Sequence, residues 1–412
     1  MQKLQPNISK QESKKPAQYI LIIYLISMIF SVMFEYCIYS KAENIVLSIV
    51  ITILAFIPIT EIVIQIIQYI LSKFIKPKLI PKLDLINGIP EEYTTVVVIP
   101  TIIKNVEKVK ELFSKLEVFY LANKSENLYF VLLGDCTSSK KQSEDFDREL
   151  INAGKEEIEK LNKKYPNANL GKFQFLYRKR TWSKGENVYL GWERKRGLLT
   201  QFNEFLINCK NYSKRKNNFP FLANTIDEYL KQSEENVLPN IRYIITLDAD
   251  TDLVLNTGLE LVGAMAHILN KPVLDKQKNV VIDGYGIMQP RIGVDLTASK
   301  RSLFAEIFAG NGGVDSYTNA ISDTYQDNFG EGIYTGKGIY DLKTFEKVLD
   351  NAIPENTVLS HDLLEGNYLR CGLVSDIMLM DGYPYKYNSF MTRLHRWIRG
   401  DWQITMWLRW KD

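Results

Sequence analysis

The stretch "TLDADTDL", residues 246–253, places three carboxylates within five positions directly after the apolar, β-branched run "IRYIIT" of residues 241–246. Such a run predicts a buried strand, so Asp248, Asp250 and Asp252 crowd its carboxyl end. Like charges this close disfavour one another's ionisation unless a positive charge lies between them. Either the three carboxylates point apart into water, or a cation is their missing partner.

The segments around this stretch alternate between strand and helix patterns. Short apolar runs predict strands at 93–100, 128–135, 173–178 and 241–250. A helix is predicted at about 103–122, and a second, charged helical segment follows the strand at 128–135 and ends at about residue 164. Nearly continuous apolar strands separated by helices indicate an α/β domain with a doubly wound mixed sheet, mostly parallel and buried on both faces. Ligands of such sheets gather outside the carboxyl ends of the strands.

A second aspartate, Asp135, ends the predicted strand "LYFVLLGD". Because parallel strands have their carboxyl ends at one edge of the sheet, Asp135 is expected at the same edge as Asp248 and Asp250. Aspartate is also a common turn and helix-cap residue at strand ends, and for Asp135 this alternative stays open.

Composition excludes several classes of protein and site. The chain has 412 residues, which suits one large domain or two average ones, and its net charge of +3 is too small to argue for a nucleic-acid partner. The four cysteines lie far apart with no CxxC pair, and only three histidines are present, so no convincing zinc site can be drawn.

A metal ion in this chain should therefore be a hard one held by oxygen. Mg²⁺ or Mn²⁺ takes one or two protein carboxylates together with water and substrate phosphates. Asp248 and Asp250 flank a single residue, so both can face the same small volume, and a nucleotide diphosphate would complete the shell. The phosphatase motif Asp-x-Asp-x-Thr/Val is disfavoured, because its fifth position is Asp252 here.

Two apolar segments precede the α/β pattern. Residues 19–34 carry no charge, and residues 45–59 begin a second run that continues to residue 75. About 20 apolar residues span a bilayer as a helix, so 19–75 predicts two transmembrane helices, the second bending at Pro58 into an interfacial extension. A cleaved signal peptide and two buried core helices are the alternatives.

Lysines predict the orientation of this pair. They lie before the first segment and after the second, whereas only Lys41 lies in the connecting hairpin. The positive-inside rule then places both ends in the cytosol, as in a multi-pass protein of the inner (plasma) membrane with a cytosolic catalytic domain. The remaining boundaries are a tail at 1–18, a linker at 76–92, the α/β domain at 93–390 and an interfacial helix at 391–412. This last segment holds four of the six tryptophans, which suits a membrane–water boundary.

Several motifs resemble those of GT-A nucleotide-diphospho-sugar transferases, especially processive membrane enzymes such as cellulose and hyaluronan synthases. The motifs are Asp135 in "LLGDCT", the Asp248-x-Asp250 pair, Asp362 in "SHDLLEG", and Arg396-Trp397 in "RLHRWIRGDWQ". Longer strings are similar to the glucosyltransferase domain of cyclic β-1,2-glucan synthases, from about residue 55 to the end. They are "GIPEEYTTVVVIPT", "GWERKRGLL", "GNGGVDSYTNAISDTYQDNFGEGIYTGKGIYD", "SHDLLEG" and "HRWIRGDWQ".

The chain departs from these relatives in informative places. A His-Asp pair stands where cellulose synthases have Glu-Asp, and Arg393 replaces the glutamine before the Arg-Trp motif. Members of the glucan synthase family are far longer, so we expect cyclising and phosphorylase-like regions on a longer or a separate chain.

The resemblance implies a membrane-bound inverting glucosyltransferase that moves glucose from UDP-glucose to a growing β-1,2-glucan, with Mg²⁺ or Mn²⁺ on Asp248 and Asp250. The UDP-glucose donor, the glucan acceptor and the lipid bilayer are the implied partners. By the same resemblance Asp362 is the general base, Arg396 holds the leaving diphosphate and Trp397 stacks on the acceptor sugar.

Five further residues are considered for roles by resemblance. Asp135 is expected near the uracil or ribose, and one of Lys195 and Arg196 at the diphosphate. Gly336 and Lys337 are expected to line the acceptor site.

Two other functions stay open at this stage. The chain is then either an incomplete, inactive membrane-anchored module that binds UDP-sugars, or a metal-dependent phosphohydrolase. Asp362 also has a structural alternative, since an acidic residue in a first helical turn behind the N-cap residue Ser360 complements the helix dipole. A working base would need partial desolvation or a carboxylate neighbour such as Glu365.

Overall fold

The computed structural model describes residues 14–42, 44–74, 79–167, 170–212, 220–232, 238–275, 277–309, 324–358 and 360–408. The chain divides into two compact units, one of Met1–Lys78 with Ile321–Glu331 and one of Leu79–Ala320 with Gly332–Asp412. Most of the predicted N-terminal tail, the first part of the glycine-rich string from residue 310, and the last four residues of the predicted interfacial helix lie outside the described residues.

The first unit contains two long apolar helices, α1 (Lys14–Ala42) and α2 (Ile45–Phe74), and the short α11 (Thr324–Phe329). Ala17–Lys41 and Ile45–Leu71, with mean hydropathies of 2.1 and 2.5, are long and apolar enough to cross a membrane. Their large apolar side chains are mostly exposed, which is the pattern of lipid-facing helices rather than of a soluble core. The predicted pair of apolar helices is therefore present, beginning at Lys14 within the expected tail.

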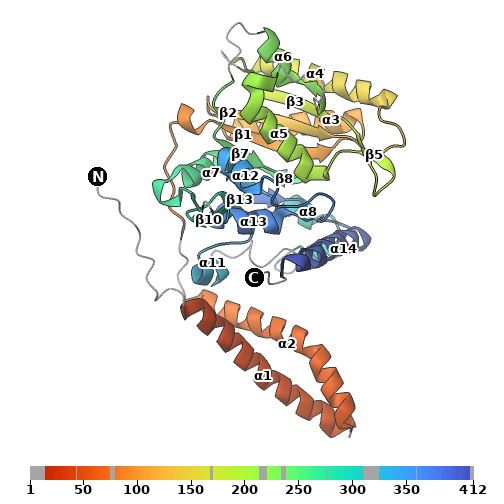
Figure 1. Ribbon diagram of the computed structural model, residues 1–412, viewed down its shortest axis with the longest axis vertical. Helices are drawn as coiled ribbons and strands as arrows, with labels where there is room; N and C mark the ends of the chain where they lie inside the picture. Colours follow the sequence, from red (N-terminus) through yellow and green to blue (C-terminus); the bar gives the residue numbers. More distant parts are fainter. Residues whose placement is uncertain are drawn as a thin grey trace, which may run out of the picture. The chain divides into compact units, whose positions relative to one another are not determined.

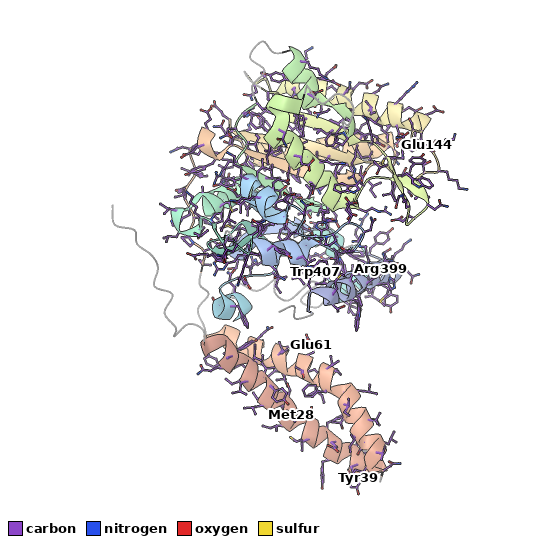
Figure 2. All side chains as sticks on the ribbon, in the orientation of Figure 1. Met28, Tyr39, Glu61, Glu144, Arg399 and Trp407 are labelled. Carbon is purple, nitrogen blue, oxygen red and sulfur yellow. The ribbon has the colours of Figure 1, made fainter. Side chains whose placement is uncertain are left out.

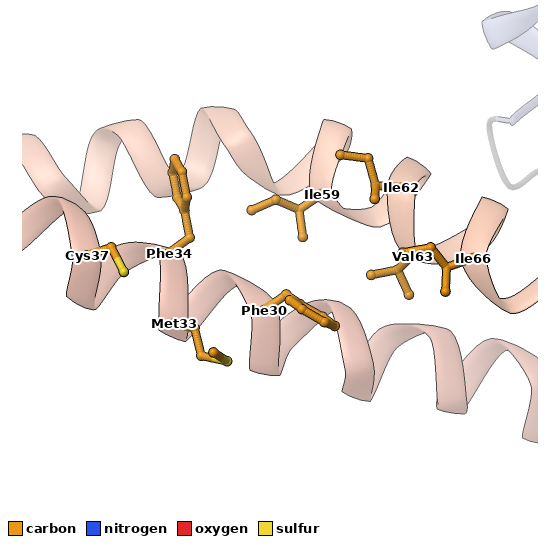
Figure 3. Close-up of a pocket in the computed structure, with 8 residues that line it drawn as sticks. All are labelled: Phe30, Met33, Phe34, Cys37, Ile59, Ile62, Val63 and Ile66. Atoms are coloured by element: carbon orange, nitrogen blue, oxygen red, sulfur yellow. The ribbon is translucent and has the colours of Figure 1, made fainter.

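The two long helices face each other through apolar side chains. Phe30 and Phe34 of α1 and Ile59 and Val63 of α2 line an apolar space between them (Figure 3). Glu61 is the acidic residue within the second apolar segment, where it accepts a hydrogen bond from Gln65, and Figure 2 marks its position on α2. The helix assignment runs without interruption through Pro58, and the division into a spanning part and an interfacial part stays a prediction.

The second unit is built on one nine-stranded sheet with the order β6-β3-β2-β1-β7-β12-β11-β13-β8 (Figure 1). Its strands are β1 (Thr95–Ile102), β2 (Leu128–Asp135), β3 (Phe173–Arg178), β6 (Phe221–Asn224), β7 (Tyr243–Thr246), β8 (Thr251–Asp252), β11 (Ile287–Val294), β12 (Gly338–Asp341) and β13 (Cys371–Asp381). The main helices are α3 (Val106–Ala122), α4 (Asp145–Lys164), α5 (Arg194–Tyr212), α6 (Thr225–Gln232), α7 (Thr257–Ala266), α12 (Leu342–Leu349), α13 (Asp362–Leu369) and α14 (Tyr387–Ile404).

Smaller elements complete this unit. They are the hairpin β4 (Thr181–Ser183) with β5 (Val188–Leu190), the hairpin β9 (Val273–Asp275) with β10 (Val280–Asp283), the helices α8 (Leu296–Ser299) and α9 (Leu303–Phe308), and the 3-10 turns η1 (Glu91–Tyr93), η2 (Ile268–Asn270) and η3 (Thr405–Leu408).

Helices cover both faces of the sheet, as the apolar strands predict. Successive residues of β1 alternate between two cores: Val97 and Ile99 pack in the core that contains α3, α4 and α7, while Val96 and Val98 pack in the core that contains α5 and α12. A strand buried on both faces must be apolar throughout, which explains the unbroken "TVVVI" of β1.

The mixed sheet is confirmed, but its parallel part is smaller than the pattern predicts. Strands β3, β2, β1 and β7 are parallel neighbours, and β11 pairs with β13 in parallel. By contrast β12 runs antiparallel between β7 and β11, and the edge strands β6 and β8 are antiparallel too. The prediction of a mostly parallel sheet is therefore wrong for the second half, because β12 enters between β7 and β11 in the opposite direction to both.

The predicted edge of the sheet is confirmed by register. Asp135 at the end of β2 lies opposite Ile102 at the end of β1, and Thr246 at the end of β7 lies opposite Val98. All three strands end at the same edge. The turn after β7 is then fixed from the far side, because β8 pairs with the end of β13 and the Gly382 backbone N–H donates to the carbonyl of Asp250 at 3.0 Å.

Candidate functional site

Asp248, directly after β7, lies between two lysines from distant parts of the chain. Its Oδ1 accepts a hydrogen bond from Lys195 Nζ on α5 at 2.6 Å, and its Oδ2 lies 3.5 Å from Lys337 Nζ, just before β12. Burial disfavours the charge of Asp248, but the two ammonium groups outweigh it and lower the pKa of its carboxyl to about 2. Lys195 responds in the opposite direction: burial disfavours its charge, but Asp248 and Asp362 raise its pKa.

The other two aspartates of the opening stretch have partners of their own. Asp250 Oδ2 lies 3.7 Å from Arg393 Nη2 on α14, and its side chain is 49% exposed. Asp252 is turned away from both and pairs with Lys115 Nζ on α3 at 2.8 Å. The crowding in the sequence is thus relieved in two ways, since the carboxylates diverge and each meets a basic side chain.

Lys337 is held in place by a residue that the sequence analysis missed. Its ammonium group is bonded to Asp381 at the end of β13, whose other carboxylate oxygen accepts from Thr251 Oγ1 at 2.5 Å. Both Lys337 and Asp381 are buried. Burial raises the pKa of Asp381, against the opposing effect of Lys337. The available signal was that "IMLMD" is another apolar run ending in aspartate, like β2.

Gly336 brings a further carboxylate to this group. Its φ of +87° favours glycine, and a Cβ there would lie 2.7 Å from Asp362 Oδ1. The carbonyl of Gly336 accepts from Lys195 Nζ at 2.9 Å. Asp362 is therefore packed against Gly336, whose carbonyl accepts a hydrogen bond from Lys195 as Asp248 does.

Asp362 stands beside a buried histidine–glutamate pair. His361 Nδ1 lies 2.7 Å from Glu365 Oε1 and 3.7 Å from Asp362 Oδ1. Burial opposes the charge of His361, but the carboxylates of Glu365 and Asp362 outweigh it and raise the pKa of the imidazole. Asp362 Oδ1 is buried and has no hydrogen-bond partner within the described part of the chain. Partial desolvation, one of the two conditions for a base, is thus met.

The predicted N-cap of this helix is wrong. Helix α13 begins at Asp362 with His361 in the N-cap position, so Ser360 lies one residue before it. Ser360 instead packs against α14, where a Cβ at Gly400 would approach its Cβ to 2.4 Å. A small residue at this crossing lets α14 come close to α13 and the site.

The carboxylate of Asp135, expected near the nucleoside, is bound by an arginine. Its carboxylate accepts from Arg178 Nε at 3.1 Å and from Arg178 Nη2 at 2.6 Å, a bidentate pair. Asp135 and Arg178 side chains are 6% and 1% exposed. The nucleoside role of Asp135 stays a prediction, while its structural partner is clear.

The basic residues predicted from the "ERKRG" string separate. Lys195 reaches Asp248, whereas Arg196 pairs with Glu193 at 2.6 Å and donates to the carbonyl of Ile353 at 2.9 Å. The structure therefore brings Lys195 into the site and leaves Arg196 outside it.

The Arg-Trp motif lies on α14, which begins at Tyr387, four residues before its predicted start. Arg396 is exposed and makes no hydrogen bond or ion pair with any residue that the structure describes. Arg393, one turn earlier on α14, is the residue whose guanidinium lies 3.7 Å from Asp250. The same guanidinium lies 5.0 Å over the ring of Trp397. Ile398, Trp402 and Met406 are exposed on this segment, as is Arg399 in Figure 2.

The acidic pair offers the oxygen donors that a hard divalent ion needs. Asp250 is half exposed, and only one of its oxygens faces Arg393, so the other is open to a ligand. At Asp248, Oδ2 is the more weakly held oxygen, because Lys337 lies 3.5 Å away. Asp248 and Asp250 supply the carboxylate oxygens that Mg²⁺ or Mn²⁺ takes, with Lys195 and Lys337 as competing cations, and the ion itself stays a prediction.

Comparison with known proteins gives a relative that matches most of this chain. The chain is 40% identical over 336 residues, 81% of its length, to the cyclic beta-(1,2)-glucan synthase NdvB of Rhizobium meliloti (strain 1021). The match spans only 11% of that protein's length. No protein-family model matches the chain. The predicted resemblance is thus confirmed at the level of a glucan synthase-related domain.

Proposed function

We propose that this domain transfers glucose from UDP-glucose to a growing β-1,2-glucan, with inversion at the anomeric carbon, from the cytosolic side of the inner membrane. The observation that carries the proposal is the meeting of Asp248, Lys195, Lys337, Gly336 and Asp362 at the carboxyl edge of the sheet, in a chain related to a glucan synthase. The edge is where sheets of this class bind their ligands.

The donor's diphosphate is assigned to the basic side of the site. Lys195, Lys337 and Arg393 are the cations that lie near Asp248 and Asp250. As the glycosidic bond breaks, UDP leaves with added negative charge, and these basic side chains stabilise that charge. On α14, Arg393 joins Arg396 in stabilising the leaving diphosphate, because the guanidinium of Arg393 lies near Asp250.

Metal binding is assigned to Asp250 and Oδ2 of Asp248, where a divalent ion would supply further positive charge to the departing diphosphate. Since the diphosphate then competes with Asp248 for the lysines, Lys195 and Lys337 turn from the carboxylate to phosphate oxygens. Asp248 and Asp362 raise the pKa of Lys195 against the effect of burial, so its ammonium group carries the charge that this exchange needs.

Asp362 is assigned the general-base role. One displacement with inversion needs one base, which takes the proton of the acceptor hydroxyl as that oxygen attacks the anomeric carbon. Asp362 Oδ1 is buried and accepts no hydrogen bond from any described residue, His361 being 3.7 Å away, so it can accept that proton. Trp397 is exposed beside Arg393 and offers a face on which the acceptor sugar stacks.

The proposal is tested with membranes that contain the full chain, supplied with UDP-glucose, Mg²⁺ and a sophorose-type acceptor. Mass spectrometry should show lengthened acceptors and methylation analysis should show 1,2-linkages. Asp362→Asn is expected to lower the rate by about 10²-fold or more. Asp275→Asn, at the end of β9, changes a strand-end aspartate outside the site and should leave the rate unchanged.

Two results would replace this function with an alternative. Equal, slow UDP release by wild type and Asp362→Asn would indicate a UDP-sugar-binding module without activity. Hydrolysis of a simple phosphate ester, with no preference for a UDP-sugar, would indicate a phosphohydrolase.

A further inference from the structure

The turn between β5 and α5 has an unusual backbone. Glu193 and Arg194, two consecutive residues with side chains, have φ values of 51° and 53°. Left-handed conformations are unfavourable for residues with a Cβ, and they persist only where the surroundings impose them. Such residues gather at functional sites. The question is what holds this turn.

One buried guanidinium holds it at two points. Arg178 Nη1 donates to the carbonyl of Trp192 at 2.7 Å, and Nη2 donates to the carbonyl of Arg194 at 2.9 Å. The same guanidinium forms the bidentate pair with Asp135. Arg178 therefore ties the carbonyls on both sides of Glu193 to the end of β2.

Close packing leaves this arrangement little freedom. A Cβ at Gly191 would lie 2.2 Å from both Arg178 Nη2 and Asp135 Oδ1, and a Cβ at Gly197 would lie 2.0 Å from the Trp192 carbonyl. The Glu193 carboxylate adds two contacts, accepting from the backbone N–H of Asn356 at 2.7 Å and pairing with Arg196.

The next residue after this turn is Lys195. Its ammonium group reaches Asp248 and the carbonyl of Gly336. A continuous series of contacts thus runs from Asp135 through Arg178 and the turn to Lys195 and Asp248. The two aspartates at the sheet edge are connected through one arginine and one strained turn.

We infer that Arg178 is a positioning residue that fixes the Lys195 ammonium at the diphosphate subsite by holding Glu193 and Arg194 in the left-handed conformation. The inference rests on the proposed function, because it takes the diphosphate of UDP as the ligand of Lys195. A planar fork is required for this task, since one side chain must satisfy a carboxylate and two carbonyls together; lysine keeps the charge but not the fork.

The test is a double-mutant cycle on UDP binding to the full chain in detergent, measured by calorimetry with Mg²⁺ present. Arg178→Lys and Lys195→Met are each expected to weaken UDP binding about tenfold, the loss of one charge-assisted hydrogen bond. The double variant should bind no more weakly than Lys195→Met alone, because Arg178 acts through Lys195.

Arg180 supplies a matched control. It is also fully buried and ion-paired, with Asp147, but the carbonyl to which it donates is that of Thr137 and does not belong to the turn. Arg180→Lys should lower the unfolding temperature about as much as Arg178→Lys while leaving UDP affinity unchanged. Equal loss of affinity in both variants would overturn the inference.

A rescue variant keeps the test decisive if Arg178→Lys folds poorly. Glycine adopts the left-handed conformation without strain, so adding Arg194→Gly to Arg178→Lys should restore most of the lost UDP affinity. Absence of rescue, or additive losses in the cycle, would overturn the inference while wild-type UDP binding leaves the proposed function standing. Wild-type protein that binds no UDP would overturn both.

Discussion

Asp135 and Asp248 lie at the ends of β2 and β7, the parallel strands on either side of β1, yet their surroundings differ. Asp135 is closed off: one arginine takes both of its oxygens and water is excluded. The side chain of Asp248 is 32% exposed and contacts two lysines, Lys195 at 2.6 Å and Lys337 at 3.5 Å. A carboxylate with all its partners fixed stabilises structure, whereas one held loosely by several cations can exchange them for a ligand.

The largest expected effect comes from Asp248→Asn. The variant keeps the shape but removes the charge that orders Lys195 and Lys337, so glucosyl transfer should fall by about 10²-fold or more. The unfolding temperature should change by only a few degrees, because the side chain is partly exposed. Transfer assays and thermal unfolding of the same preparation check this, and a collapse of the fold with Asp248→Asn would remove the contrast with Asp135.

Asp135→Asn should instead lower the stability of the fold. Removing one partner leaves Arg178 as an uncompensated buried charge, which costs about 3–5 kcal/mol of unfolding free energy. Denaturant titration of the purified chain measures this. Full stability of the variant would show that Asp135 is not mainly structural.

A pH-dependent contribution to stability is expected at His361. Glu365 and Asp362 overcome burial and raise the pKa of the imidazole above its ordinary 6.5. A raised pKa means that the folded state holds the proton more tightly. The stabilisation is therefore complete below about pH 6.5 and is lost as pH rises through the folded-state value.

Thermal unfolding of wild type and His361→Gln between pH 5 and 9 checks this sign. Glu346, whose pKa burial raises to about 7, also makes wild-type stability fall in this range, so only the difference between the two proteins reports His361. A difference that does not shrink with rising pH would contradict the prediction.

The smallest effect is expected for Asp252→Asn, the third aspartate of the opening stretch. Its side chain is 50% exposed and its pair with Lys115 lies outside the site. Exposed pairs contribute at most about 1 kcal/mol, so stability should change little and glucosyl transfer should not change. A transfer defect comparable to that of Asp248→Asn would mean that all three aspartates serve one ion.

Sequence patterns were sufficient for the local features of this fold. The runs at 128–135 and 173–178 form β2 and β3 with the predicted bounds, and the strand-end aspartates lie at the expected edge. Patterns failed where the outcome depends on neighbours. The antiparallel insertion of β12, the role of Ser360 and the approach of Arg393 rather than Arg396 to the acidic group all follow from packing between distant segments.

The sequence alone determined that strands end in aspartates, that two long apolar helices precede them, and that the chain resembles a glucan synthase domain. These features depend on local apolar periodicity and on recognisable strings. Only the tertiary structure decided which cation meets which carboxylate. Lys195 lies 53 positions from Asp248 in the chain, and Lys337 arrives only because β12 pairs with β7. Charge pairing at such separations is set by strand order and register, which no local pattern encodes.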